Sequence, residues 1–286
     1  MERLGASRIW SFLQDADTIQ QVSNRQIRQD PGLRVANYLD LAARIAELQF
    51  RNRDHVLLFR GQPLDYRSTR RSTSLKASIF RPPPGRAVLP APTLERRYAR
   101  LAVAETMLVD AFGVHGWTGR LRVQRQRLLR WAILQHYEVC PTPLLDVTQS
   151  LRIAASFAST PGSEEAYLFA LAVPNISGAI TASAEAGLQI VRLASVCPPA
   201  ALRPHIQEGY LLGEYPDLSS PPQREIYKPY QLDFGQRLIG KFRFTPATFW
   251  SDPNFPPVQH AALYPQGRDW LEEASTAIRA RLAAMP

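Results

Sequence analysis

Three side chains that lie far apart in the sequence, an arginine, a histidine and an aspartate, are the first candidates for chemistry. Arg60 ends a short apolar run and is followed by Gly61 and Gln62. A guanidinium at a strand end can hold a phosphate through two parallel hydrogen bonds, and the glycine frees the backbone that aims it. The alternative is a buried ion pair with Asp146. Because a buried pair is a poor route to stability, we favour ligand contact for Arg60.

His136 and Tyr137 end a predicted helix just before a proline-containing turn. A histidine there can act as an acid or base or bond a ribose hydroxyl, and the tyrosine can stack on a flat ring. A helix-end histidine and a core tyrosine explain the same residues equally well. Asp146 and Thr148 follow, and we expect Asp146 to orient the arginine or the histidine. Thr148 is placed to cap the next helix.

The motifs of several enzyme classes are missing from the sequence. It has no Walker loop, no Gly-x-Gly-x-x-Gly and no Gly-x-Ser-x-Gly elbow. The His-x-Glu at His136 and Glu138 lacks the Cys-x-x-Cys partner of a zinc deaminase. Cys140 and Cys197 fit neither a disulfide framework nor a zinc spacing. We therefore expect two buried thiols and assign no metal site.

The composition favours an anionic partner. The 286 residues include 34 Lys+Arg against 25 Asp+Glu, a net charge of +9, and the lysines are Lys76, Lys228 and Lys241, so the excess is arginine. RNA, DNA or a nucleotide would suit such a chain, and an ordinary solvated basic surface explains the charge as well. The first residues lack the apolar core of a signal peptide, and no run approaches the roughly 20 apolar residues of a membrane span. We expect a cytoplasmic protein, without membrane contact and of open oligomeric state.

The elements that position these residues follow from apolar spacing. The first 35 residues have a weak helical pattern. Further helices are expected at 37–48, 93–111, 123–137, 149–159 and 269–283. Strands are expected at 55–59, 167–173, 189–193, 205–212, 225–230 and 238–245. Helices dominate the first half and strands the second, which predicts an α+β fold rather than alternating βαβ units.

Several motifs, taken in order, resemble the FRG domain, which is named for its first triplet. They are Phe59-Arg60-Gly61-Gln62, Ser78-Ile79-Phe80-Arg81, Gln135-His136-Tyr137, Pro141-Thr142, Leu144-Leu145-Asp146-x-Thr148, Ala154-Ala155-x-Phe157-Ala158 and Arg203-x-x-x-Gln207-x-Gly209-Tyr210. The resemblance covers the chain from about residue 50, so we expect a helical extension over 1–50 and an FRG domain over 51–286. The chain departs from the family where Glu138 replaces a glycine, Pro143 an arginine and Val147 a tryptophan.

A more distant resemblance is to the Arg-Ser-Glu type ADP-ribosyltransferases, in which an arginine holds NAD and a late acid stabilises the oxocarbenium ion. It implies a helical amino-terminal half packed on a mostly antiparallel split sheet. The late residue would be Gln207, which matches the FRG pattern, or Glu225 in a Gln-x-Glu motif. A glutamine cannot stabilise positive charge as a carboxylate would. Ser72-Thr73-Ser74 also imitates the transferase motif, but it follows Arg60 too closely, and we treat it as chance.

The two resemblances together imply a set of site residues that we expect to converge on one cleft. Catalysis would involve His136, Gln207 and Glu225. NAD would be bound by Arg60, Gly61, Gln62, Tyr137, Asp146 and Thr148. The predicted function is an NAD-dependent ADP-ribosyltransferase or NAD glycohydrolase, with a toxin or phage-defence effector as its setting and nucleic acid or protein as its acceptor. The alternatives are a non-catalytic module that binds a nucleotide or nucleic acid, and a metal-free nuclease with His136 as base.

Overall fold

The computed structural model describes the chain except for residues 2, 3, 5–8, 15, 17, 87, 161, 218–231, 266–268 and 286. The chain divides into two compact units, each built from three segments. The first unit contains Met1–Leu75, Val147–Ile176 and Asp233–His260, and the second contains Lys76–Asp146, Ser177–Leu232 and Ala261–Pro286. Residues 1–50 cluster with the first unit, because the helix α1 (Asn24–Gln29) and the strand β3 (Leu33–Arg34) contact the strand β10 (Leu238–Phe244).

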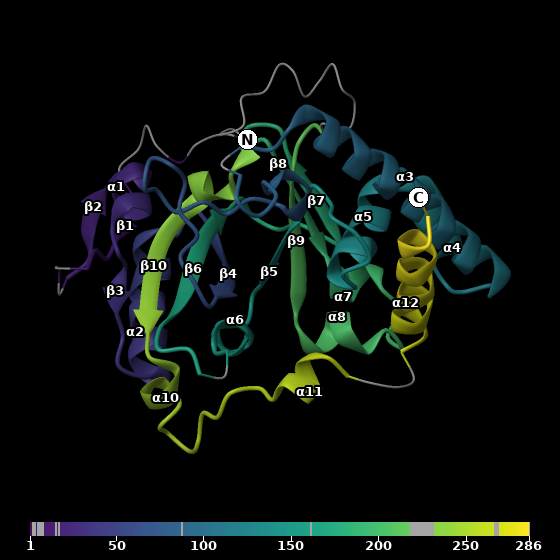
Figure 1. Ribbon diagram of the computed structural model, residues 1–286. Coiled ribbons are helices and arrows are strands. Elements are labelled where there is room, and N and C mark those ends of the chain that lie inside the picture. The colour runs from purple at the N-terminus through teal and green to yellow at the C-terminus, as the bar shows by residue number, and fades with distance from the viewer. Residues whose placement is uncertain are drawn as a thin grey trace. The chain divides into compact units, whose positions relative to one another are not determined.

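A sheet forms the core of the first unit, with its strands in the order β3-β10-β6-β4-β5. Their bounds are Leu33–Arg34 for β3, Leu238–Phe244 for β10, Ala166–Val173 for β6, Val56–Gln62 for β4 and Leu145–Thr148 for β5, whose first two residues belong to the second unit. β3 pairs parallel with β10, and the other neighbours pair antiparallel. Figure 1 shows β10, β6 and β4 side by side. The continuous apolar run in β6 explains its central place, since both of its faces are buried.

The expected helix over the first 35 residues is wrong. This stretch forms the strands β1 (Ile9–Ser11) and β2 (Gln20–Val22), then the short helix α1 (Asn24–Gln29). The side chain of Asn52 accepts a hydrogen bond from the Trp10 N–H at 3.1 Å and donates to the Trp10 carbonyl at 3.0 Å. This amide pairs with the extended backbone as a neighbouring strand would.

Two longer helices of the first unit begin at polar caps. α2 (Tyr38–Arg51) begins at Asn37, whose Oδ1 accepts the Asp40 N–H at 2.9 Å, as the sequence predicts. α6 (Leu151–Ala158) begins at Ser150 and not at Thr148. Thr148 instead accepts the Ser150 N–H at 3.0 Å and fixes the turn before the helix. Two shorter helices are η3 (Phe234–Arg237) and α10 (Pro246–Phe249).

The second unit combines helices with the strands β9-β8-β7, which pair antiparallel. The strands are β7 (Ile180–Ser183), β8 (Leu188–Arg192) and β9 (Gly209–Glu214). The helices are η1 (Ser78–Phe80), α3 (Ala91–Val114), α4 (Arg120–Arg125), α5 (Arg127–His136), α7 (Leu193–Val196), α8 (Leu202–Ile206), α11 (His260–Leu263, whose first residue belongs to the first unit) and α12 (Trp270–Ala283). Figure 1 shows α3 beside α5 and α12.

Three expectations for this unit need correction. The helix expected over 123–137 is broken into α4 and α5, because Gln126 takes extended backbone angles. The strand expected over 205–212 begins only at Gly209, since α8 precedes it. The sequence analysis also missed β7, which pairs with β8. The strand expected over 225–230 lies outside the described residues.

Both units mix helices with mostly antiparallel strands, which confirms the α+β class. Among the helices that the structure describes, none has the length and apolar character to cross a membrane. Cys140 and Cys197 are free and buried, as expected. Burial raises the pKa of each thiol to about 12.

Candidate functional site

The side-chain amide of Gln135 connects three other residues of the sequence motifs, and we name this group the Gln135 cluster. Its Oε1 accepts hydrogen bonds from Ser78 Oγ at 2.9 Å and from Thr142 Oγ1 at 2.7 Å. Its Nε2 donates to Asp146 Oδ2 at 2.6 Å. The orientation of the amide is consistent, because the hydroxyls can donate and the carboxylate can only accept. Four separate motifs therefore meet at the side-chain amide of Gln135 in the second unit.

Asp146 is the accessible group of this cluster, and His136 is the buried one. The Asp146 side chain is 36% exposed and that of His136 only 4%, with 3.6 Å between Asp146 Oδ1 and His136 Nδ1. His136 Nε2 is buried and has no hydrogen-bond partner among the described residues. Gly209 closes the site from β9, since a Cβ there would lie 3.1 Å from His136 Cε1.

We expected His136 to take part in catalysis and Asp146 to orient Arg60 or His136. In the structure the carboxylate of Asp146 is the more exposed group of the pair, and the imidazole of His136 is buried. The roles of both residues toward a substrate stay a prediction. In the part of the chain that the structure describes, no three His, Cys, Asp or Glu side chains gather as a metal site would require.

The end of α5 places Glu138 in a backbone conformation that favours glycine. The Val139 N–H bonds the Leu134 carbonyl at 2.9 Å and the Glu138 N–H bonds the Gln135 carbonyl at 3.0 Å, which is a Schellman motif. Glu138 takes the left-handed conformation of this motif, with φ 55°. Its side chain accepts a hydrogen bond from Arg203 at 2.8 Å. That ion pair offsets part of the strain that a glycine would avoid.

Arg203 is a neighbour of the site that the sequence analysis quoted in a motif but gave no role. It is buried, lies 3.6 Å from Glu272 and stacks over the ring of Tyr264 at 4.5 Å. Burial raises the pKa of Tyr264, and the charge of Glu138 adds to this rise. Arg203 therefore joins α8 to the end of α5 and to α12. The sequence signal that could have identified it is its position in the Arg203-x-x-x-Gln207 motif.

Tyr137 and Gln207 have structural partners. Tyr137 is fully buried and donates its hydroxyl to Asp269 Oδ2 at 2.9 Å. Burial, followed by the charge of Asp269, raises the pKa of Tyr137 strongly. Gln207 is also buried and donates to the Leu263 carbonyl at 2.7 Å. The structure thus favours the core-tyrosine alternative for Tyr137. Glu225 lies outside the described residues.

Arg60, Gly61, Gln62 and Thr148 belong to the first unit. Arg60 and Gln62 are two positions apart on β4 and therefore lie on the same face of the sheet. Gln62 is 8% exposed, and its Oε1 is buried without a hydrogen-bond partner among the described residues. That oxygen can accept a hydrogen bond from a bound hydroxyl or amide. Thr148 is buried in β5 and pairs with Phe59.

Gly61 has a different role from the one that we expected. We attributed it to backbone freedom beside Arg60. In the structure Gly61 lies within β4, paired with Leu168, and a Cβ there would be 1.7 Å from the carbonyl oxygen of Ala154 in α6. Glycine is needed because the helix packs directly on the strand.

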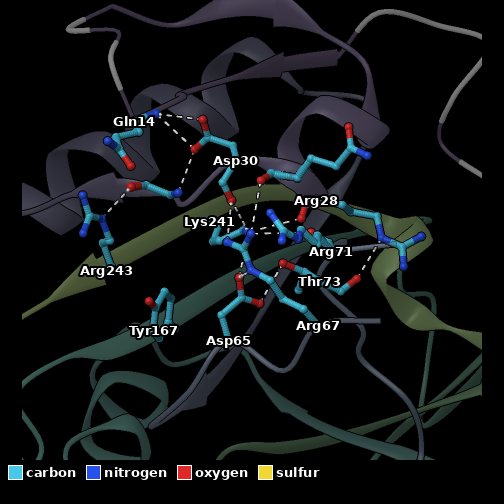
Figure 2. A network of polar contacts seen from close by, with 12 residues as sticks. Gln14, Arg28, Asp30, Asp65, Arg67, Arg71, Thr73, Tyr167, Lys241 and Arg243 are labelled. Atoms are coloured by element: carbon cyan, nitrogen blue, oxygen red, sulfur yellow. Dashed lines mark hydrogen bonds and ion pairs between the residues drawn. The ribbon is translucent and has the colours of Figure 1, made fainter. Parts of the chain in front are cut away.

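A second polar cluster of the first unit surrounds Lys241 (Figure 2). Lys241 is 1% exposed and donates to Asp65 Oδ2 at 3.0 Å, to the Arg28 carbonyl at 3.4 Å and to the Asp30 carbonyl. Burial lowers its pKa, and Asp65 opposes this shift. All three ammonium hydrogens have an acceptor, so Lys241 holds loops in place. Thr73 is buried and donates to Asp65 Oδ1 at 2.8 Å, which supports the view that its Ser-Thr-Ser sequence is a chance likeness.

Residues 56–166 match the sequence model of the FRG domain. Among the curated proteins and the solved structures, none matches this chain. The matched region contains the whole Gln135 cluster together with Arg60, Gly61, Gln62, His136, Tyr137 and Thr148. Gln207 and Glu225 lie beyond it. The common cleft for residues of both units stays a prediction.

Proposed function

We propose, on the premise that residues 56–166 are an FRG domain, that this chain binds NAD and breaks the bond between its nicotinamide and its ribose. The ADP-ribose passes to water or to an acceptor. The substrate-facing carboxylate in this proposal is Asp146, in place of the late residue that the resemblance located at Gln207 or Glu225.

The observation that supports the proposal is the preorganised and accessible carboxylate of Asp146. One oxygen accepts the hydrogen bond from Gln135 Nε2, and the other faces His136 Nδ1. The bonds of Ser78 and Thr142 hold Gln135 in turn. A negative charge fixed before the reaction stabilises a cationic transition state without the cost of reorganisation.

The proposed chemical step is cleavage of the glycosidic bond of NAD. The bond from C1′ of the ribose to N1 of nicotinamide breaks, and its electron pair leaves with nicotinamide. The sugar becomes an oxocarbenium ion, whose positive charge Asp146 stabilises. The oxygen of water or of an acceptor hydroxyl then bonds C1′, and its proton passes to the solvent. Asp146 forms no covalent bond in this scheme.

The test is nicotinamide release from NAD by the purified chain, by its Asp146→Asn variant and by a control. Asn keeps an oxygen that can accept from Gln135 but removes the charge. Asp110→Asn is the matched control, since Asp110 is an exposed carboxylate on α3 of the same unit. We expect Asp146→Asn to lower the rate by about 100- to 1,000-fold, the range for loss of one preorganised electrostatic group. Equal rates for the two variants would contradict the role of Asp146.

A second candidate function is a nucleotide-binding module without turnover. The burial of both His136 and Gln207 favours it, because two of the three predicted catalytic side chains have little access to a ligand. In that case NAD or a related nucleotide would bind with a measurable heat in calorimetry, and no nicotinamide would be released.

The remaining features of the proposal follow the resemblance. These features are the likeness to a transferase split sheet, the toxin or phage-defence setting, the cytoplasmic location and the nucleic-acid or protein acceptor. NAD contacts by Arg60, Gly61 and Gln62 also stay part of it. A direct test of the acceptor is mass spectrometry of RNA, DNA and protein after incubation with the chain and NAD.

A further inference from the structure

Residues 111–137 form a long stretch without any negative side chain. Between Asp110 and Glu138 there are five arginines and no carboxylate: Arg120, Arg122, Arg125, Arg127 and Arg130. The stretch runs from the end of α3 through α4 to the end of α5, all within the second unit. A surface built from it therefore has a local excess of positive charge.

Three of these arginines are available to a partner. Arg120, Arg122 and Arg125 are exposed, and no hydrogen bond or ion pair joins their guanidinium groups to any residue that the structure describes. Arg127 and Arg130 differ, since both pair with the buried carboxylate of Glu105, at 3.3 and 2.8 Å. The pairing of the last two leaves a distinct group of three exposed cations on α4.

The geometry of α4 directs two of them outward. Val123 is 2% exposed and marks the inner face of the helix. Arg122 and Arg125 are three positions apart and therefore neighbours on the helix surface, with Arg125 nearly opposite to Val123 and Arg122 at the side of the helix. Arg120 lies toward the end of α3, with its guanidinium 3.8 Å from the place of a Cβ on Gly113.

Aromatic rings lie immediately before these arginines. Trp117 packs on Trp270, with 3.6 Å between ring centroids. His115 stacks on Trp117 at 4.6 Å with an angle of 10° between the rings, and His115 is exposed. The Trp117 carbonyl accepts the Arg120 N–H at 3.2 Å, which joins the ring stack to the start of α4. A supported ring with an exposed face can stack on an unpaired base.

We propose that His115, Trp117, Arg120, Arg122 and Arg125, the arginine–aromatic surface, bind single-stranded nucleic acid. The arginines fit phosphates through their forked donors, and the His115–Trp117 stack fits a base. A duplex would offer the phosphates without an unstacked base, and an acidic membrane would leave the flat ring unused. The combination therefore favours a single strand over both.

Binding is tested by the fluorescence anisotropy of labelled oligouridine and oligothymidine, at salt concentrations from about 50 to 200 mM. The patch variant carries Arg120→Gln, Arg122→Gln and Arg125→Gln. Its matched control carries Arg25→Gln, Arg53→Gln and Arg70→Gln, which remove the same charge from exposed positions of the first unit. The slope of log affinity against log salt concentration is negative. We expect its magnitude to decrease by roughly 2 in the patch variant and to stay unchanged in the control.

The aromatic part has its own test, because His115→Ala leaves the charge of the arginines unchanged. We expect it to weaken oligouridine binding by roughly 5- to 100-fold, with a smaller effect on a duplex of the same length. Equal oligonucleotide affinities for the wild type, the patch variant and the control would overturn the proposal. The proposal would also be overturned if the chain bound anionic vesicles through the three arginines and did not bind oligonucleotides.

This inference stands apart from the proposed NAD chemistry, and the two fail in different ways. The patch variant should still release nicotinamide from NAD in water at the wild-type rate, while Asp146→Asn should still bind oligouridine. Loss of oligouridine binding in the Asp146→Asn variant, with a native melting curve, would contradict the separate surface.

Discussion

Among the glycines that the structure describes, Gly61 leaves the least room for an added Cβ. Gly61→Ala would place a Cβ 1.7 Å from the Ala154 carbonyl oxygen, 2.7 Å from its carbonyl carbon and 3.0 Å from the Ala158 nitrogen. To reach even a tight separation of 3.0 Å, β4 and α6 must move apart by at least 1.3 Å, the difference between 3.0 and 1.7 Å. All three atoms are backbone, so no rotamer change can relieve the overlap.

The neighbouring packing makes this movement costly. Gly61 pairs with Leu168 in the buried strand β6, and Ala154 and Ala158 are fully buried in α6. Overpacking that side chains can absorb costs about 1–3 kcal/mol. Here the backbone must shift, so we expect a loss of about 3 kcal/mol or more from the free energy of unfolding. That is a large part of the roughly 5–15 kcal/mol of a typical domain.

The assay is urea unfolding followed by circular dichroism, with Gly113→Ala as the matched control. Gly113 lies within α3, and the nearest atoms to its added Cβ belong to the Arg120 guanidinium, at 3.8 Å. Alanine is the better helix former, so this control should gain about 0.5–1 kcal/mol. Adding Ala154→Gly to Gly61→Ala should give no rescue, because the overlap is with a carbonyl group. A Gly61→Ala variant within about 1 kcal/mol of the wild type would refute the close packing of α6 on β4.

Three further predictions concern the ligand, the cluster and the thiols. If Arg60 holds a phosphate, Arg60→Lys should weaken NAD binding almost as much as Arg60→Ala, by about 10- to 100-fold in calorimetry, with little change in melting temperature. A large fall in melting temperature with wild-type affinity would show instead that Arg60 is structural. Gln135→Met removes the amide that bonds two hydroxyls and Asp146, so it should cost about 1–3 kcal/mol in thermal unfolding and also slow nicotinamide release; a variant that loses neither would contradict the organising role of Gln135. With pKa values of about 12, the thiols of Cys140 and Cys197 are only about 10⁻⁴ ionised at pH 8. Ellman's reagent should therefore react slowly with the folded chain and rapidly in urea, and fast labelling of the native chain would contradict their burial.

The elements that the sequence predicted well are those with local signals. Asn37 caps α2 and Asp269 caps α12 through bonds to residues two or three positions away. The amino-terminal strands could not be predicted in this way, because Asn52, 42 positions further on, satisfies the backbone of Trp10. The break at Gln126 carries no glycine or proline that would have marked it.

The candidate site was predicted in its members more than in its arrangement. The motifs named Asp146 and His136 and suggested that one orients the other, and the structure places them 3.6 Å apart. Which of them faces outward depends on the packing of Gly209 against the imidazole, 73 positions away in sequence. Gln135 stood in a quoted motif, but its bonds to Ser78, Thr142 and Asp146 arise only when four segments fold together.

The most direct measurement is mass spectrometry of NAD after incubation with the purified wild-type chain. The proposed function predicts release of nicotinamide in an amount equal to the ADP-ribose found free or attached to an acceptor. It also predicts that this release is lost in Asp146→Asn and kept in Asp110→Asn. If NAD binds to the wild-type chain with measurable affinity but stays intact, the proposed turnover is contradicted and the chain is a nucleotide-binding module.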